Sequence, residues 1–118
     1  MERTHRAATS DLGTVSVTSE AVAQLVGATA AECYGVVGMA SHGRLPRVLA
    51  RKRLTKGIEV VGREDGLAID LHVVVEHGLK LAEVAATVRS RVTYEVERAT
   101  GLDVGSMEVR IDDVRSKV

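Results

Sequence analysis

The sequence predicts a single α+β domain, a two-layer α/β sandwich in which two amphipathic helices cover one face of a small mixed sheet. The chain has 118 residues, of which 45% are hydrophobic, so it can build one core but not two. Two segments show apolar residues at helical spacing, and extended segments separate them. The expected order is β-α-β-β-α-β, with a short extra helix before the second strand.

The first elements follow a polar tail. Residues 1–12 show no hydrophobic period and are expected to be disordered, so the domain is expected to span residues 13–118. The sequence GTVSV at residues 13–17 predicts a short strand. A helix is expected next, because Thr18 or Ser19 can cap its first turn and because one stripe of side chains recurs at intervals of three and four. This stripe consists of Val22, Leu25, Val26, Thr29 and Cys33.

The middle of the chain is expected to hold a loop, a short helix and a strand. The glycines of residues 35–43 indicate a loop. Pro46 suits the first position of a short helix over residues 45–53. The sequence KGIEVVG at residues 56–62 predicts a strand, and the REDG that follows at residues 63–66 predicts a hairpin turn.

The second half of the chain has the clearest patterns. Residues 67–76 alternate between an apolar set and a more polar set, which predicts a strand with one face in the core. A long helix is expected over residues 80–100, ending at Gly101, and a last strand over residues 102–114. The helical residues expected to point inward are Leu81, Val84, Val88, Val92, Val96 and Ala99.

Composition narrows the possible classes of function. The chain has no Phe and no Trp, and its sixteen basic residues are balanced by sixteen acidic ones. Dedicated nucleic-acid binders are usually basic and often stack bases on aromatic side chains. One cysteine excludes an internal disulfide, and the four histidines are not spaced as zinc ligands. No cofactor or metal is expected, and the lack of a signal sequence or a membrane-spanning segment favours the cytoplasm.

Positive charge is concentrated in residues 44–56, which we term the basic segment. It holds six Arg or Lys residues and no acidic residue. A docking surface for an acidic protein, for phosphates or for anionic lipid head groups would explain this cluster. A solvated helix whose long side chains cover apolar surface would explain it as well. The candidate partner-binding residues are Arg47, Arg51, Lys52, Arg53 and Lys56.

Asp70 and His72 are the one pair that could suggest catalysis. They lie two residues apart on a strand, so they point to the same face, where Arg110 or Asp112 could lie opposite. A carboxylate beside a histidine can orient a general base, but catalysis also needs a nucleophile and a concave pocket. An ordinary polar face with cross-strand charge pairs is favoured, and a dimer or filament interface is a third interpretation. We therefore expect no enzymatic activity.

Five sequence strings occur in a characteristic order, namely GTVSVTSEAV, AAECYGVVGM, RKRLTKGIEV, LAIDLHVVVEHGLKLAEVAATVRSRV and VERATGLDVGSMEVRIDDV. Together they resemble the bacterial alkaline-shock and general-stress protein family, also called the envelope stress response family, over residues 13–114. The resemblance implies a small cytoplasmic protein without an established enzymatic reaction, associated with alkaline or cell-envelope stress. Some members reach the membrane through a separate anchored partner, some self-associate, and others are linked to fatty-acid precursor metabolism.

The expected function is that of a non-enzymatic stress-response adaptor, associated with the cell envelope, that acts through protein–protein contacts. Its partner is expected to be a protein, either a membrane-anchored one or a second copy of the chain. The expected location is the cytoplasm, including the inner face of the cell membrane where such a partner holds it. The alternative is a nucleic-acid-binding module that uses the basic segment.

Overall fold

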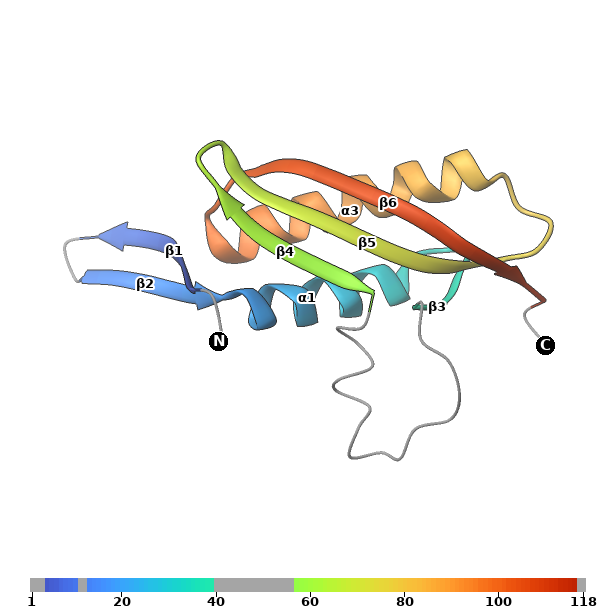
Figure 1. Cartoon of the computed structure of the whole chain (residues 1–118), viewed down its shortest axis with the longest axis horizontal. Coiled ribbons are helices and arrows are strands. Elements are labelled where there is room, and N and C mark those ends of the chain that lie inside the picture. The colour runs from blue at the N-terminus through green and yellow to red at the C-terminus, as the bar shows by residue number, and fades with distance from the viewer. Residues whose placement is uncertain (1–3, 11–12, 40–56, 117–118) are drawn as a thin grey trace, which may run out of the picture.

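The computed structural model describes residues 4–10, 13–39 and 57–116, and it confirms the predicted α+β class with two helices against a sheet (Figure 1). The elements are, in chain order, β1 (Thr4–Ser10), β2 (Gly13–Thr18), α1 (Ser19–Glu32), β3 (Val36–Met39), β4 (Ile58–Arg63), β5 (Gly66–Glu76), α3 (Leu81–Thr100) and β6 (Val104–Arg115).

Strand β5 is the centre of the main sheet, because it pairs with three other strands. β4 pairs antiparallel with its first half and β3 with its second half, where Met39 lies opposite Val73. β6 pairs in parallel along the other edge. β3 and β4 therefore form two parts of one edge. The chain leaves this edge after Met39 and returns at Gly57, whose carbonyl accepts a hydrogen bond from the His72 N–H (2.8 Å).

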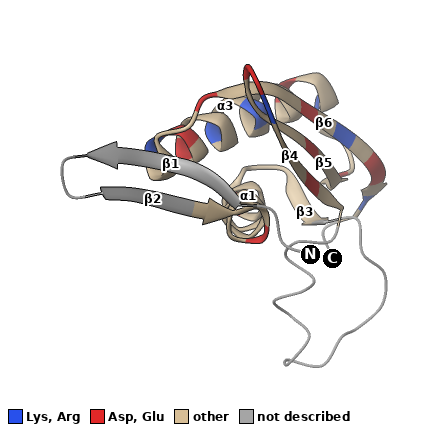
Figure 2. Cartoon of the chain, turned by 60° about the vertical axis from the view of Figure 1, so that its left-hand side comes forward, with Lys and Arg blue, Asp and Glu red and all other residues tan. Residues whose placement is uncertain are grey.

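The core lies between the sheet and the two helices, which cover the same face of the sheet (Figures 1 and 2). Alternate positions of β5 point toward the helices, as the period of two predicts. Burial of one such Val, Leu or Ile side chain stabilises the fold by about 1.5–3 kcal/mol. The residues that are at most 2% exposed include Leu67, Ile69, Leu71, Val73 and Val75 on β5, Val22 and Val26 on α1, and Val88, Val92 and Val96 on α3.

The ends of both helices follow from the residues found there. The Thr18 hydroxyl accepts a hydrogen bond from the Ala21 N–H (3.1 Å), which confirms the predicted cap of α1. α3 ends at Gly101, which has a φ of 74° and whose N–H bonds to the Glu97 carbonyl. The predicted helix boundaries are therefore confirmed to within about two residues.

The prediction of disorder over residues 1–12 is wrong for residues 4–10, which form β1. Thr4 lies opposite Thr18 and Ser10 opposite Gly13, so β1 and β2 make an antiparallel two-stranded ribbon that extends beyond the main sheet (Figure 1). Backbone pairing of this kind needs no hydrophobic period, which is why the polar sequence did not reveal it. The predicted first strand exists as β2, but β3 takes its place in the main sheet.

The loop predicted over residues 35–43 is also wrong in part, because Val36–Met39 is strand β3. The second half of β5 requires a hydrogen-bonding partner, and the pairing extends to the Glu76 N–H, which bonds to the Gly35 carbonyl (2.7 Å). The two glycines, Gly35 and Gly38, obscured a strand of only four residues. The predicted short helix over residues 45–53 lies outside the described residues.

Two residues predicted to point inward from the second helix are exposed instead. Leu81 is the first residue of α3 and is 39% exposed, and Ala99 is exposed as well. Thr100 is buried at the other end of the helix, where its hydroxyl donates to the Val96 carbonyl (2.7 Å). The helix therefore buries a narrower stripe than predicted, at a regular spacing of four.

The turn between β4 and β5 is packed tightly against the start of β6. Gly66 has a φ of 122°, and the adjacent Leu67 N–H donates to the Asp103 carbonyl (2.8 Å). A β-carbon at Gly66 would collide with the same carbonyl oxygen. Only glycine satisfies both the backbone conformation and this close approach.

We expect Gly66→Ala to lower the free energy of unfolding by roughly 1–3 kcal/mol, since it combines backbone strain with a collision against the Asp103 carbonyl. Urea unfolding followed by circular dichroism measures this change. Gly38→Ala is the matched control, because nothing lies within 4 Å of a β-carbon at that position. Equal unfolding midpoints for the two variants would contradict this account of the turn.

Candidate functional site

Strands β4, β5 and β6 carry several charged residues (Figure 2). Alternation along each strand directs these side chains to the side of the main sheet that faces away from the helices. We term this side the open sheet face, since no described helix or strand packs on it. Half-buried Val61 and Ala68 lie opposite each other within it, on β4 and β5. Its central charged residues are Glu59 and Arg63 on β4, Asp70 on β5, and Glu108, Arg110 and Asp112 on β6.

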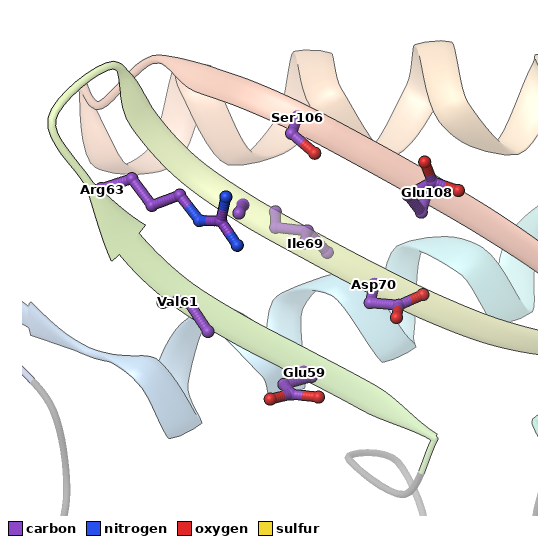
Figure 3. Close-up of a pocket in the computed structure, with 8 residues that line it drawn as sticks. Glu59, Val61, Arg63, Ile69, Asp70, Ser106 and Glu108 are labelled. Atoms are coloured by element: carbon purple, nitrogen blue, oxygen red, sulfur yellow. The ribbon is translucent and has the colours of Figure 1, made fainter.

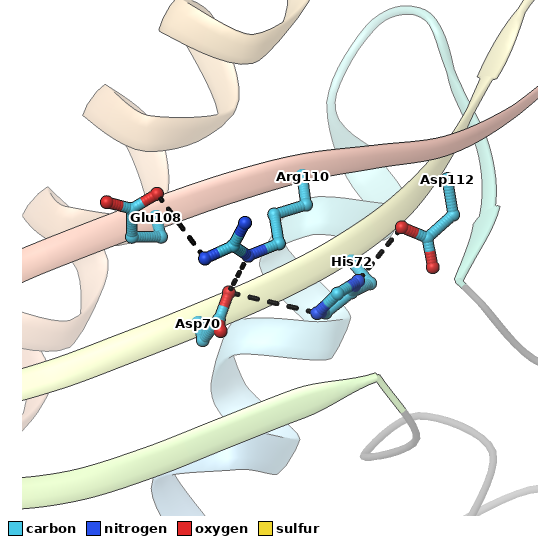
Figure 4. A network of polar contacts seen from close by, with 5 residues as sticks. All are labelled: Asp70, His72, Glu108, Arg110 and Asp112. Carbon is cyan, nitrogen blue, oxygen red and sulfur yellow. Dashed lines mark hydrogen bonds and ion pairs between the residues drawn. The ribbon is translucent and has the colours of Figure 1, made fainter.

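A chain of polar contacts joins β5 to β6 across this face (Figure 4). His72 Nδ1 lies 2.9 Å from Asp112 Oδ1, and His72 Nε2 lies 3.8 Å from Asp70 Oδ1. Arg110 Nε donates to the same Asp70 oxygen at 3.0 Å, and its Nη2 lies 3.9 Å from Glu108 Oε2. The predicted common face of Asp70 and His72, with Arg110 and Asp112 opposite, is thereby confirmed.

The network lies in contact with solvent. Its side chains are 34–62% exposed, so water and salt screen the attraction between them. Ser106 carries a hydroxyl on this face, but it pairs with Ala68, four residues along β5 from His72. That separation is about 13 Å along a strand, too far for His72 to take a proton from this hydroxyl. The geometry is that of a fixed charge pattern on a surface.

A shallow hollow of about 190 Å³ lies beside the network (Figure 3). Arg63 extends its guanidinium over the hollow from the end of β4, and Glu59, Asp70 and Glu108 line the other end. Sites for small organic ligands usually measure about 300–1,000 Å³ and enclose most of the ligand. The hollow is smaller than such sites and is open to solvent. It is therefore a shallow depression in a broad surface and not an enclosed ligand site.

The candidate residues of the basic segment, Arg47, Arg51, Lys52, Arg53 and Lys56, lie outside the described residues. Both neighbouring ends of the described chain lie beside β5, Met39 opposite Val73 and Gly57 bonded to His72. The basic segment is therefore attached at the edge of the sheet, next to the charge network. Sequence reasoning did not bring these two features together, because it treated β3 as a loop.

Sequence reasoning placed Val61 on this face but missed the two charged residues that β4 contributes to it. Glu59 and Arg63 frame the hollow, together with Val61 between them. The signal was present, because these residues alternate with Ile58 and Val60, which face the core. Short strands with a mixed composition give this alternation little statistical weight.

Neither metal ligation nor a membrane span is found in the described part of the chain. Across residues 4–10, 13–39 and 57–116, no three His, Cys, Asp or Glu side chains form a group suited to holding a metal ion. Of the helices described there, none combines the length and the hydrophobicity that crossing a membrane requires.

Cys33 is buried at the end of α1, as its place on the predicted stripe suggested. It is 4% exposed, and its thiol donates to the Thr29 carbonyl (3.5 Å). Burial raises the pKa of the Cys33 thiol, more than the nearby Arg91 guanidinium lowers it. The thiolate, which is the reactive form, therefore forms at higher pH than in a free cysteine.

We expect Arg110→Ala to change the free energy of unfolding by less than about 1 kcal/mol, because each ion pair that it breaks is exposed to solvent. Urea unfolding at low and moderate salt checks this expectation, with the loss becoming smaller as salt increases. A loss of several kcal/mol would mean that the network supports the fold and is not a surface feature.

We expect the Cys33 thiol to react with a disulfide reagent at least about tenfold more slowly in the native chain than in urea, since burial and a raised pKa act in the same direction. The native rate should increase at a higher pH than that of the unfolded chain. The Cys33→Ser variant has no cysteine, so its signal with the reagent gives the background of the assay. Equal rates in the two states would show that the thiol is accessible.

Comparison with solved structures finds proteins of similar fold. Solved structures of variants of the MamM CTD match 80% of this chain and 93–95% of their own, with a TM-score of 0.50 and 15–16% identity. At this identity the likeness concerns the fold alone, and it agrees with the α+β arrangement described above.

Sequence relatives cover nearly the whole chain. The uncharacterized protein YloU of Bacillus subtilis is 33% identical over 107 residues, covering 87% of this chain and 89% of that protein. The uncharacterized protein Spy1614 of Streptococcus pyogenes is 28% identical, with 87% and 88% covered. The model of the alkaline-shock protein 23 family, which is the alkaline-shock protein family and is described as having a cell envelope-related function, matches residues 7–116. The family resemblance noted in the sequence is thereby confirmed, and the chain belongs to the alkaline-shock protein family.

Proposed function

We propose that this protein is a non-enzymatic adaptor of the cell envelope stress response that acts through protein–protein contacts. The open sheet face is the observation that carries the proposal. It combines charged side chains with half-buried Val61 and Ala68 on a surface three strands wide. Protein interfaces place a polar rim around an apolar centre, and in our proposal Val61 and Ala68 are that centre.

The charge network supports recognition rather than chemistry. Asp70, His72 and Arg110 hold one another in place through contacts of 2.9–3.8 Å with each other and with Asp112. A charge pattern that is already ordered loses little conformational freedom when a partner binds. It also rejects partners with the wrong distribution of charge, which gives specificity.

The family supports the cellular setting of the proposal. Its members share a cell envelope-related function. In our proposal the protein works in the cytoplasm and reaches the inner face of the membrane by binding an anchored partner. The basic segment supplies the contact to acidic side chains of that partner, through Arg47, Arg51, Lys52, Arg53 and Lys56.

We expect replacing Arg51, Lys52 and Arg53 together by Ala to weaken capture of the partner by about tenfold. Three exposed ion pairs at about 0.5 kcal/mol each account for this factor. Cross-linking in cells, followed by quantitative recovery of the tagged protein with its partners, measures the capture. Circular dichroism and the urea midpoint should remain those of the unchanged chain.

The matched control removes three positive charges from the helical layer, with Lys80, Arg89 and Arg98 changed to Ala. Lys80 and Arg98 have side chains that are 83% and 63% exposed, and Arg89 is exposed as well. We expect this triple variant to capture partners as the unchanged chain does. Equal capture by both triple variants would remove the basic segment from the proposal, and loss of capture on nuclease treatment would assign the segment to nucleic acid.

A further inference from the structure

Strand β6 forms an outer edge of the main sheet, with β5 on its inner side (Figure 1). It runs for 12 residues, about twice the usual length of a strand. No other strand of residues 4–10, 13–39 and 57–116 pairs with it. Unpaired backbone groups attract further strands, so edge strands are commonly short or carry proline or lysine. Residues 104–115 contain neither proline nor lysine.

The middle of β6 is regular enough to pair with a further strand. Register shifts near each end of the β5–β6 pair enclose residues 106–111, which pair without interruption with residues 68–73 of β5. A bulge bends a strand and interrupts its hydrogen bonds, so pairing on the outer side is favoured between the two shifts.

Backbone direction on β5 identifies the outward-facing groups of this stretch. The Leu67 N–H donates toward β6, to the Asp103 carbonyl, whereas the His72 N–H donates toward β4, to the Gly57 carbonyl. Odd-numbered residues of β5 therefore point toward β6, because backbone direction alternates along a strand. In a parallel pair, the residue opposite such a position directs its own N–H and C=O to the other side. The outward-facing residues of β6 are Met107, Val109 and Ile111, which lie opposite Ile69, Leu71 and Val73.

The same part of β6 leaves the core incompletely covered. The side chains of Met107, Val109 and Ile111 pack against the core but are only partly buried. The three residues beside them on β5 are at most 1% exposed. An added strand would cover this apolar row and would also bond to the outward-facing backbone groups.

Charge along β6 defines the segment that fits beside it. Glu108 is 62% exposed, and its carboxylate lies 3.9 Å from Arg110 Nη2. Arg110 is held toward β5, because its Nε donates to Asp70 Oδ1 at 3.0 Å. The outer edge is therefore negative beside its apolar row. A strand placed there complements it with Lys or Arg next to Glu108 on one face and apolar side chains next to Val109 on the other.

We propose that β6 binds an extended segment of a partner protein by strand addition, a segment in which apolar residues alternate with Lys or Arg. This inference rests on the proposed function, because it names the element through which a protein partner binds. In such complexes the backbone hydrogen bonds supply affinity, and the alternate side chains supply specificity.

Hydrogen exchange followed by NMR tests the inference with purified full-length protein and the synthetic peptide acetyl-TVKVKVT-amide. We expect the amides of Met107, Val109 and Ile111 to exchange rapidly in the free chain. Saturation with peptide should slow them at least about tenfold, because they gain hydrogen-bond acceptors. The amides of Glu108 and Arg110 point toward β5, so they serve as the internal reference and should change little.

Peptides with N-methyl groups separate strand addition from attraction between side chains. One form is methylated at its Val residues and the other at its Lys residues, so each blocks the N–H groups along one edge of the peptide. We expect one form to bind at least about tenfold more weakly and the other to bind as the unmodified peptide does. Glu108→Lys should reverse the preference between this peptide and one with Glu in place of Lys.

Val109→Pro removes one outward N–H from the protein and should weaken peptide binding at least about tenfold. Proline is tolerated on an edge strand where the N–H faces solvent, so the pairing with β5 should persist, and circular dichroism checks the fold. Val109→Ala is the matched control, because it shortens the same side chain but keeps the N–H. We expect this variant to bind the peptide within about threefold of the unchanged chain.

Three results would overturn the inference. These are no protection at about 1 mM peptide, equal binding of both methylated forms, and slow exchange of the three outward amides in the free chain. Slow exchange that appears only at high protein concentration would assign this edge to a second copy of the chain. In each case, loss of capture in cells by the Arg51, Lys52 and Arg53 triple variant would leave the proposed function standing.

Discussion

The burial of β5 is the constraint on which the rest of the structure depends. Its core-facing residues are almost completely inaccessible, and three other strands pair with it. Because neither Phe nor Trp is present, this core is filled mainly by Val, Leu, Ile and Ala from β4, β5 and the two helices. Small branched side chains fill such a space only at close approach, which fixes both helices against the same face. The opposite face carries the exposed charged side chains of β5 and β6, although Val74 on the same face is only 2% exposed.

The sequence was most informative where one side of an element is buried. The alternation of residues 67–76 and the four-residue spacing of Val84, Val88, Val92 and Val96 predicted β5 and α3 correctly. The cap at Thr18 and the helix end at Gly101 were predictable from local chemistry. Such features depend on a residue and its near neighbours, so they can be recognised without knowing the fold.

Features that depend on distant backbone partners could not be predicted in this way. β1 is polar and owes its structure to pairing with β2, and β3 has four residues with a glycine among them. The pairing of Asp70 with Arg110 and of His72 with Asp112 requires a parallel register between strands forty residues apart. The shared face of Asp70 and His72 was predictable, but the participation of Glu59 and Arg63 needed the position of β4.

The fold relates the uneven charge distribution of the sequence to one edge of the main sheet. The main-sheet edge is interrupted between Met39 and Gly57, and the chain between these residues contains the strongest positive cluster of the protein. The open sheet face beside this interruption has the opposite sign. A neutral chain organised in this way can bind charged partners strongly at short range while generating little long-range attraction to nucleic acids or to other polyanions.

Fractionation of cells that express the tagged protein at its native level, with and without nuclease, tests the adaptor account most directly. The account predicts that the protein sediments with membranes and stays there after nuclease treatment, because a protein partner holds it. Sedimentation that nuclease abolishes would contradict the account and would assign the basic segment to nucleic acid. A protein recovered wholly in the supernatant would contradict the association with the envelope.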